Sequence, residues 1–109
     1  MKKEIIEQFR AVLEFCGYDY DEVFAHRRIR LYSDLRSIIF DICRRERHLV
    51  ASQIGQVFDW NRSTVHCAME KVYGLRRTDR AYSDMYDSIH GAYMALTANK
   101  EKTDETETM

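Results

Sequence analysis

The sequence predicts an all-α fold, a small helical bundle with short connections between its helices. Three observations favour this class. The chain of 109 residues has no proline and only four glycines, and its apolar residues recur at spacings of three and four along most of its length. A chain of this size buries one modest core, so we expect a single domain over residues 1–99. Residues 100–109 are polar and acidic without an apolar pattern, which predicts a disordered tail.

The N-terminal segment predicts one amphipathic helix followed by one short helix. Over residues 2–16 the apolar side chains share a helical face, and Gly17 is typical of a C-terminal stop. Residues 18–24 indicate a turn into a short helix capped by Asp19 or Asp21. The apolar residues expected to pack from these two helices are Ile5, Phe9, Val12, Leu13, Cys16, Val23 and Phe24.

A basic segment, His26–Tyr32, precedes the helix that we expect at the centre of the core. Its three arginines fall within four positions, just before Ser33, which can cap the next helix. Such arginines are suited to clamping phosphates or entering a minor groove, and the alternative is that they pair with nearby carboxylates such as Asp34.

The helix predicted from Asp34 to about Glu46 carries the most continuous apolar stripe of the chain. That stripe consists of Leu35, Ile38, Ile39, Ile42 and Cys43. The residues predicted to lie off the stripe are Arg36, Arg44, Arg45 and Arg47. Arginines near a helix C-terminus also complement the helix dipole, so part of this cluster needs no ligand.

Residues 50–73 predict two short helices joined by about three residues, which is the outline of a helix-turn-helix. The first apolar stripe is Ala51, Ile54, Val57 and Phe58, and the second is Val65, Ala68, Met69 and Val72. Asn61 between them is a good N-cap, because its side-chain oxygen can accept from the backbone of Ser63 or Thr64. A glycine within a helix costs about 1 kcal/mol relative to alanine, and close approach of the neighbouring helix would explain Gly55. Trp60 could cover the edge of the core or stand exposed against the sugar-phosphate backbone, and we expect the first.

The second helix of this pair presents hydrogen-bond donors away from its apolar stripe. These residues are Arg62, Ser63, Thr64, His66 and Lys71. They are short near the helix start and long on its flank, as a helix that enters the DNA major groove requires. Backbone N–H groups near Ser63 are also suited to holding a phosphate.

The C-terminal part predicts a junction over Leu75–Arg80 and a long helix from Asp79 to about Asn99. Its stripe is Tyr82, Met85, Tyr86, Ile89, Tyr93 and Leu96. Such a stripe is more often core than a binding face, although part of it could form a contact with a second copy or with a partner protein.

The charge is segregated along the chain although the formal net charge is only −1. Residues 26–80 carry twelve Lys or Arg against six Asp or Glu, a formal charge of +6, and both ends are acidic. The basic middle coincides with the predicted helix-turn-helix, which favours nucleic acid as a partner over an unliganded basic face.

Other function classes find little support in the residues. Cys16, Cys43 and Cys67 are widely spaced at apolar helix positions, which predicts buried thiols rather than disulfides or a metal site. No paired carboxylates, nucleophile with a base or metal-ligand cluster stands out, so we expect no enzyme, cofactor or metal. Without an apolar run long enough to cross a bilayer or a signal peptide, we expect no membrane contact and a cytoplasmic, nucleoid-associated location.

The order and spacing of these parts resemble the C-terminal DNA-binding domain of the bacterial replication initiator DnaA. The segments that carry the resemblance, within about residues 20–90, are His26–Arg30, Leu35–Arg45, Gln53–Phe58 and Arg62–Val72. The resemblance implies an all-α fold with a helix-turn-helix, a basic loop that reaches the minor groove and a helix whose start reads bases in the major groove. The sequence has no Gly-rich Lys-Ser/Thr phosphate loop, so we expect a stand-alone relative without the ATPase module.

By motif position, the resemblance assigns DNA contacts to the basic segment and to the second helix. Together with the residue pattern, it gives the expected DNA-binding set: Arg27, Arg28, Arg30, Asn61, Arg62, Ser63, Thr64, His66 and Lys71. The chain is thus expected to bind double-stranded DNA in replication or transcription regulation. The alternative is a protein-interaction adaptor that keeps the fold and has lost DNA binding, favoured by the near-neutral net charge and the tyrosine-rich last helix.

Overall fold

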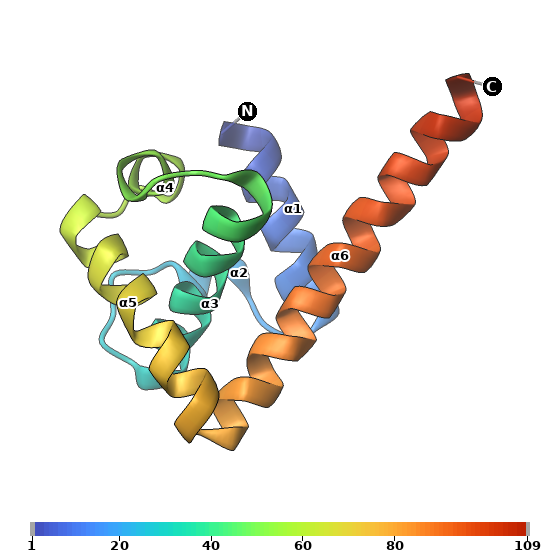
Figure 1. The fold of residues 1–109 in the computed structure, drawn as a ribbon. Coiled ribbons are helices and arrows are strands. Elements are labelled where there is room, and N and C mark those ends of the chain that lie inside the picture. Colours follow the sequence, from blue (N-terminus) through green and yellow to red (C-terminus); the bar gives the residue numbers. More distant parts are fainter. Residues whose placement is uncertain (1, 109) are drawn as a thin grey trace.

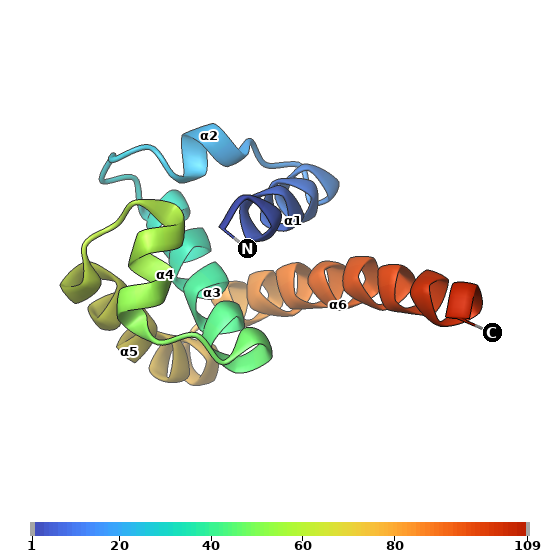
Figure 2. The ribbon, with the colours of Figure 1, turned by 90° about the horizontal axis from the view of Figure 1, so that it is seen from above.

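Six helices and no strands make up the part of the chain that the structure describes, in agreement with the predicted all-α class (Figure 1). In this computed structural model, the backbone is described for residues 2–108 and the side chains for residues 2–98. The helices are α1 (Lys2–Phe15), α2 (Tyr20–Val23), α3 (Arg30–Arg47), α4 (Ala51–Phe58), α5 (Arg62–Thr78) and α6 (Arg80–Thr108). They form one globule in which α3 is surrounded by the other helices, as the view from above shows (Figure 2).

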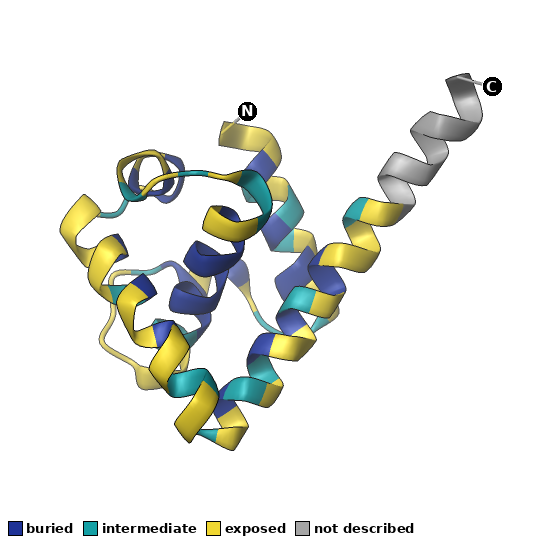
Figure 3. Ribbon diagram, viewed as in Figure 1, coloured by how far each residue is buried: buried dark blue, intermediate teal, exposed yellow. Residues whose placement is uncertain are grey.

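Helix α3 is the centre of the core, as the apolar stripe predicted. Every residue from Leu35 to Cys43 is buried, so the middle of this helix contacts protein on all sides (Figure 3). Three of those residues are polar or charged, namely Arg36, Ser37 and Asp41, and each has a hydrogen-bond partner in the protein. The prediction that Arg36 lies off the buried face was wrong.

The start of α3 also differs from the prediction. The helix begins at Arg30 rather than Asp34, and Ser33 lies inside it as a helical residue whose N–H donates to the carbonyl of Ile29, 2.9 Å away. Ser33 is therefore not a cap. Arginine is a good helix former, so a run of arginines does not by itself end a helix. The connection between α2 and α3 is correspondingly shorter than the predicted basic loop.

Helix α1 packs on α4 and α6 through aromatic rings. The ring of Phe9 stacks on Tyr93 of α6, with centroids 5.1 Å apart, and meets Phe58 of α4 edge-on at 6.1 Å. Gly17 ends this segment in a left-handed conformation with φ of +90°, as predicted. Asp19 occupies the N-cap position of α2, but its side chain makes no capping hydrogen bond there.

Helices α4 and α5 are joined by the three residues Asp59–Asn61. Asp59 takes a left-handed conformation with φ of 58° and ends α4, while the side chain of Asn61 accepts from the N–H of Ser63 at 2.8 Å, as predicted. The turn lies directly against Gly55, because a Cβ built there would be 2.4 Å from the carbonyl oxygen of Trp60. The close approach expected at this glycine therefore comes from the turn and not from the neighbouring helix.

The junction predicted over Leu75–Arg80 is instead the last turn of α5, followed by the single residue Asp79. The Thr78 hydroxyl donates to the carbonyl of Gly74, so this glycine does not end the helix. The Asp79 carboxylate accepts from the N–H of Tyr82 at 3.1 Å and thereby caps α6.

Helix α6 buries most of its predicted stripe, although Leu96 is 38% exposed. The predicted acidic tail over 100–109 lies outside the residues whose side chains are described.

Across the described residues, we find no helix that is both long and apolar enough to span a membrane. Cys43 is buried, but Cys67 of α5 is exposed, where a buried thiol was expected.

Candidate functional site

The start of α5 presents its polar side chains to solvent. Asn61, Arg62, Ser63 and Thr64 are all exposed, and the carboxamide of Asn61 holds the first turn in place through the N–H of Ser63. The N–H groups of Arg62 and Thr64 have no acceptor within the helix, as is usual in a first helical turn. This end of α5 is therefore a rigid, exposed group of donors with the positive end of the helix dipole behind it.

The basic segment lies between α2 and the start of α3. Arg27 and Arg28 are exposed in this connection, and neither forms an ion pair among the described residues. Arg30 is the first residue of α3, so it lies on a helix and not in a loop. Its guanidinium is 3.8 Å from the carboxylate of Asp34 and 3.7 Å from that of Asp79. Arg30 therefore pairs with carboxylates, which was the alternative to a DNA contact.

A stack of side chains joins the basic segment to the turn before α5. The imidazole of His26 stacks on the indole of Trp60, with centroids 4.1 Å apart and an angle of 11° between the planes. The guanidinium of Arg36 lies 4.4 Å from the same indole. His26 directly precedes Arg27, and Trp60 directly precedes Asn61. The stack therefore fixes the two exposed basic regions relative to each other.

Arg36 is the residue that holds this arrangement together. It donates to the carbonyl oxygens of Val23 at 2.6 Å and Arg27 at 3.3 Å, and more distantly to that of Ala25. Burial lowers the pKa of the Arg36 guanidinium, because the charged form loses water. The three carbonyls compensate for that loss, so one buried charge orders the backbone from Val23 to Arg27, where the basic segment begins.

A hollow of about 310 Å³ lies between α3 and α5 beside this stack. Three predicted residues, Ser63, Thr64 and Lys71, line it together with Trp60 and Arg36. Lys71 is close enough to α3 to influence Asp34. Burial raises the pKa of the Asp34 carboxyl, while Arg30 and Lys71 act in the opposite direction. The hollow therefore combines an aromatic wall with short hydroxyls and a cationic rim.

His66 is exposed but already has a partner one turn away. Its Nε2 is 2.9 Å from a carboxylate oxygen of Glu70, and both side chains are more than half exposed. A ligand contact by His66 would have to compete with this pair, and Glu70 adds a negative charge to the outer side of α5. Of the predicted set, Arg30 and His66 are thus the two residues with local acidic partners.

The remaining predicted residues are all exposed, and the His26–Trp60–Arg36 stack joins the two segments that carry most of them. We call them the basic surface, which consists of Arg27, Arg28, Asn61, Arg62, Ser63, Thr64 and Lys71. The sequence reasoning missed His26 and Arg36, whose rings and donors hold this surface together. A lone tryptophan in a turn and an arginine next to the apolar stripe of α3 were the available signals. Comparison of the chain with family models, curated proteins and solved structures found no match.

Proposed function

We propose that the chain binds double-stranded DNA through the basic surface. In this proposal α4 and α5 form a helix-turn-helix of the kind found in the DNA-binding domain of DnaA. The start of α5 enters the major groove, while Arg27 and Arg28 contact phosphates or the adjacent minor groove. The major groove is wide enough to admit one helix, and the exposed end of α5 is the part of the molecule that fits it best.

The observation that supports this proposal most strongly is the His26–Trp60–Arg36 stack. Without it, the arginines after α2 and the donors at the start of α5 would be two unrelated surface features. The stack brings the two segments that carry them into contact, which supports a single duplex as the ligand of both. Preorganised contacts also lose less conformational entropy on binding.

The proposed DNA contacts differ in the length of the side chain that makes them. Arg62 is long enough to contact base edges or a phosphate, whereas Ser63 and Thr64 make short contacts close to the helix end. Lys71 contributes a phosphate contact from the rim of the hollow. Arg30 adds less, because two carboxylates already share its charge.

A second candidate function, a protein-interaction adaptor, is favoured by a different feature. A hollow of about 240 Å³ lies between α1 and α6, with Val12, Tyr93 and Leu96 among its lining residues. Leu96 is 38% exposed there, so the apolar stripe of α6 continues onto the surface. An apolar groove of this kind suits a helix or peptide of a partner. It does not use the basic surface, so the two functions are separable by mutation.

The DNA proposal is tested with a fluorescence-anisotropy titration of mixed-sequence duplexes at low salt. We expect the double variant Arg28→Gln/Arg62→Gln to bind at least about tenfold more weakly than the wild type, because it removes two charged contacts. The matched control is Lys2→Gln/Lys3→Gln, which removes the same charge from exposed positions of α1. Its affinity should change by less than about twofold if the contacts are local.

Two results would contradict the proposal. One is the absence of wild-type binding at low salt and tens of micromolar protein, a range in which non-specific DNA binding is already measurable. The other is an equal loss in the α1 control, which would show that only net charge matters. The first result would leave the adaptor as the remaining candidate function. The second would assign DNA binding to the overall charge of the protein rather than to the basic surface.

A further inference from the structure

A second hollow lies on a different side of α5, and residues of α3, α5 and α6 line it. Its volume is about 310 Å³, and it shares no lining residue with the hollow beside Trp60. Four of its lining residues are arginines, namely Arg44, Arg45, Arg76 and Arg77. We call it the arginine pocket. None of these four residues belongs to the basic surface.

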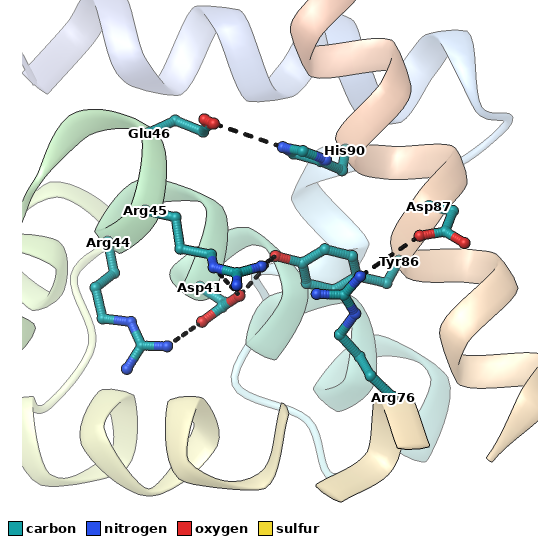
Figure 4. Close-up of polar contacts among 8 residues, drawn as sticks. All are labelled: Asp41, Arg44, Arg45, Glu46, Arg76, Tyr86, Asp87 and His90. Atoms are coloured by element: carbon teal, nitrogen blue, oxygen red, sulfur yellow. Dashed lines mark hydrogen bonds and ion pairs between the residues drawn. The ribbon is translucent and has the colours of Figure 1, made fainter. Parts of the chain in front are cut away.

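Each of these guanidinium groups is held by a neighbouring side chain, three of them in the network of Figure 4. Arg44 donates to Asp41 at 2.5 Å, and Arg45 donates to the hydroxyl of Tyr86 at 3.4 Å. Arg76 lies over the ring of Tyr86, 4.0 Å from its centroid. The remaining one, Arg77, donates to the hydroxyl of Tyr73. The donors are therefore oriented before any ligand arrives.

The charges in the pocket do not balance. Four guanidinium groups face one lining carboxylate, that of Asp41, which leaves a formal charge of +3. The Asp41 carboxylate is only 2% exposed and already accepts from Arg44 and from the hydroxyl of Tyr86 at 2.6 Å. The side chain of Asp87 offsets part of the charge of Arg76 at 3.7 Å from outside the lining. The pocket still keeps an excess of positive charge.

The donor count is also in excess. A guanidinium carries five N–H donors, and the contacts described above use one or two on each arginine. The paired N–H groups of arginine match the oxygen spacing of phosphate groups. Unused donors and uncompensated charge in one concave place are what a bound anion would satisfy.

We propose that the arginine pocket binds a compact polyanion with two or more linked phosphate groups, of the kind that forms the diphosphate end of a nucleotide. Its volume is near the lower limit for small-molecule sites, which suits a diphosphate better than a large ligand. A single phosphate would reach fewer of the unused guanidinium N–H donors than two linked phosphates would. This inference is independent of the proposed DNA binding.

The position of Arg76 favours a small anion over a duplex. Its side chain is only 33% exposed, and it lies on the ring of the buried Tyr86. A diphosphate is small enough to reach that depth, whereas the phosphates of a duplex project from a broad convex surface and reach only the rim of a pocket. A duplex would contact Arg77, which is exposed, without filling the space behind it.

Isothermal titration calorimetry of the full chain tests the proposal, with inorganic pyrophosphate, orthophosphate and ADP compared at constant ionic strength. We expect saturable binding of pyrophosphate at least about tenfold tighter than that of orthophosphate, since a second phosphate adds charge-assisted hydrogen bonds. Equal affinities for pyrophosphate and ADP would identify the linked phosphates alone as the ligand. Tighter binding of ADP would identify a nucleotide.

The variants Arg77→Gln and Arg44→Gln should each weaken pyrophosphate binding by about tenfold or more. Arg77→Gln is the safer of the two for folding, because Arg77 is exposed and bonds only to the exposed Tyr73 among the described residues. The matched control is Arg62→Gln, which removes the same charge from the basic surface and should leave pyrophosphate affinity within about twofold. Circular dichroism confirms that each variant is folded.

Three results would overturn the proposal: no heat of pyrophosphate binding up to millimolar concentration, equal affinity in Arg77→Gln and the wild type, or an equal loss in Arg62→Gln. Duplex DNA that binds Arg62→Gln as well as the wild type but binds Arg77→Gln more weakly would also overturn it, because that result would assign the pocket to nucleic acid. Because Arg62→Gln and Arg77→Gln separate the two surfaces, failure here leaves the DNA proposal standing.

Discussion

Gly55 shows how a single missing side chain fixes the turn before α5. A Cβ at this position would be 2.4 Å from the carbonyl oxygen of Trp60, which is backbone and cannot rotate away. We expect Gly55→Ala to lower the free energy of unfolding by about 1–3 kcal/mol, in spite of the better helix propensity of alanine. Urea unfolding followed by circular dichroism measures the change.

Gly91 in α6 provides the matched control. It is exposed, and a Cβ there would meet nothing within 4 Å. Gly91→Ala should therefore raise stability by about 0.5–1 kcal/mol, since alanine has the higher helix propensity. If both alanine variants were stabilised, the contact between the turn and α4 would not be a tight one.

At the residue scale, sequence reasoning succeeded where the interaction is local. The cap at Asn61 depends on the N–H group two residues later, and both are visible in one short segment. The burial of Arg36 depends instead on carbonyls of residues 23–27, which only the folded chain brings to it. The residues next to Arg36 in the sequence give no local signal that such acceptors will be present.

Helices α3 and α6 are joined by buried hydroxyl contacts that make stability depend on pH. The hydroxyls of Ser37 and Tyr82 are 2.7 Å apart, and burial raises the pKa of Tyr82 to about 12. The folded protein therefore holds the Tyr82 proton more tightly than the unfolded chain does, whose tyrosines ionise near an ordinary pKa of about 10. The contribution of Tyr82 to the free energy of unfolding is therefore fully present below pH ~10 and is lost as the pH rises towards ~12.

The variant Tyr82→Phe tests this linkage. At pH 8 we expect it to be less stable than the wild type by about 1 kcal/mol, because a buried hydrogen bond is lost. Between pH 8 and 11 its free energy of unfolding should fall by about 1 kcal/mol less than that of the wild type, because it lacks one tyrosine with a raised pKa. Urea midpoints at both pH values give the comparison. An equal loss in the two proteins would exclude Tyr82 as a source of the pH dependence.

At the element scale, the helices were predictable but two of their ends were not. The apolar periodicity of α3 and α6 located both helices correctly. The arginines near Arg30 and the glycine at position 74 suggested breaks, yet α3 begins at Arg30 and α5 passes through Gly74. Glycine and charged runs end a helix only where the chain has other partners for its backbone. Here the caps at Asp79 and the turn at Asp59 supply those partners instead.

For the whole molecule, the segregation of charge predicts a defined response to salt. Four cationic residues of the basic surface have no ion pair among the described residues, namely Arg27, Arg28, Arg62 and Lys71. If each neutralises one phosphate, the logarithm of the DNA association constant should fall with the logarithm of salt concentration with a slope of about −3.6. Arg62→Gln should make the slope less steep by about 1.

Anisotropy titrations between about 50 and 200 mM salt, the range in which phosphate contacts change affinity most visibly, provide this slope. A slope near zero would contradict binding through phosphates. Sequence reasoning alone would suggest a steeper dependence, because the predicted DNA-binding set also contains Arg30 and His66. The structure places carboxylates beside both, and those pairings come from α3, the junction before α6 and the outer side of α5.

The stacking of Trp60 on His26 also makes intrinsic tryptophan fluorescence sensitive to this contact. Trp60 is the only tryptophan of the chain, so all indole emission comes from the point where the basic segment meets the turn. The imidazole of His26 and the guanidinium of Arg36 lie 4.1 and 4.4 Å from the indole and alter its emission. Separation of the basic segment from the turn therefore changes the emission. Fluorescence of the unlabelled protein therefore reads out the alignment of its two basic regions directly.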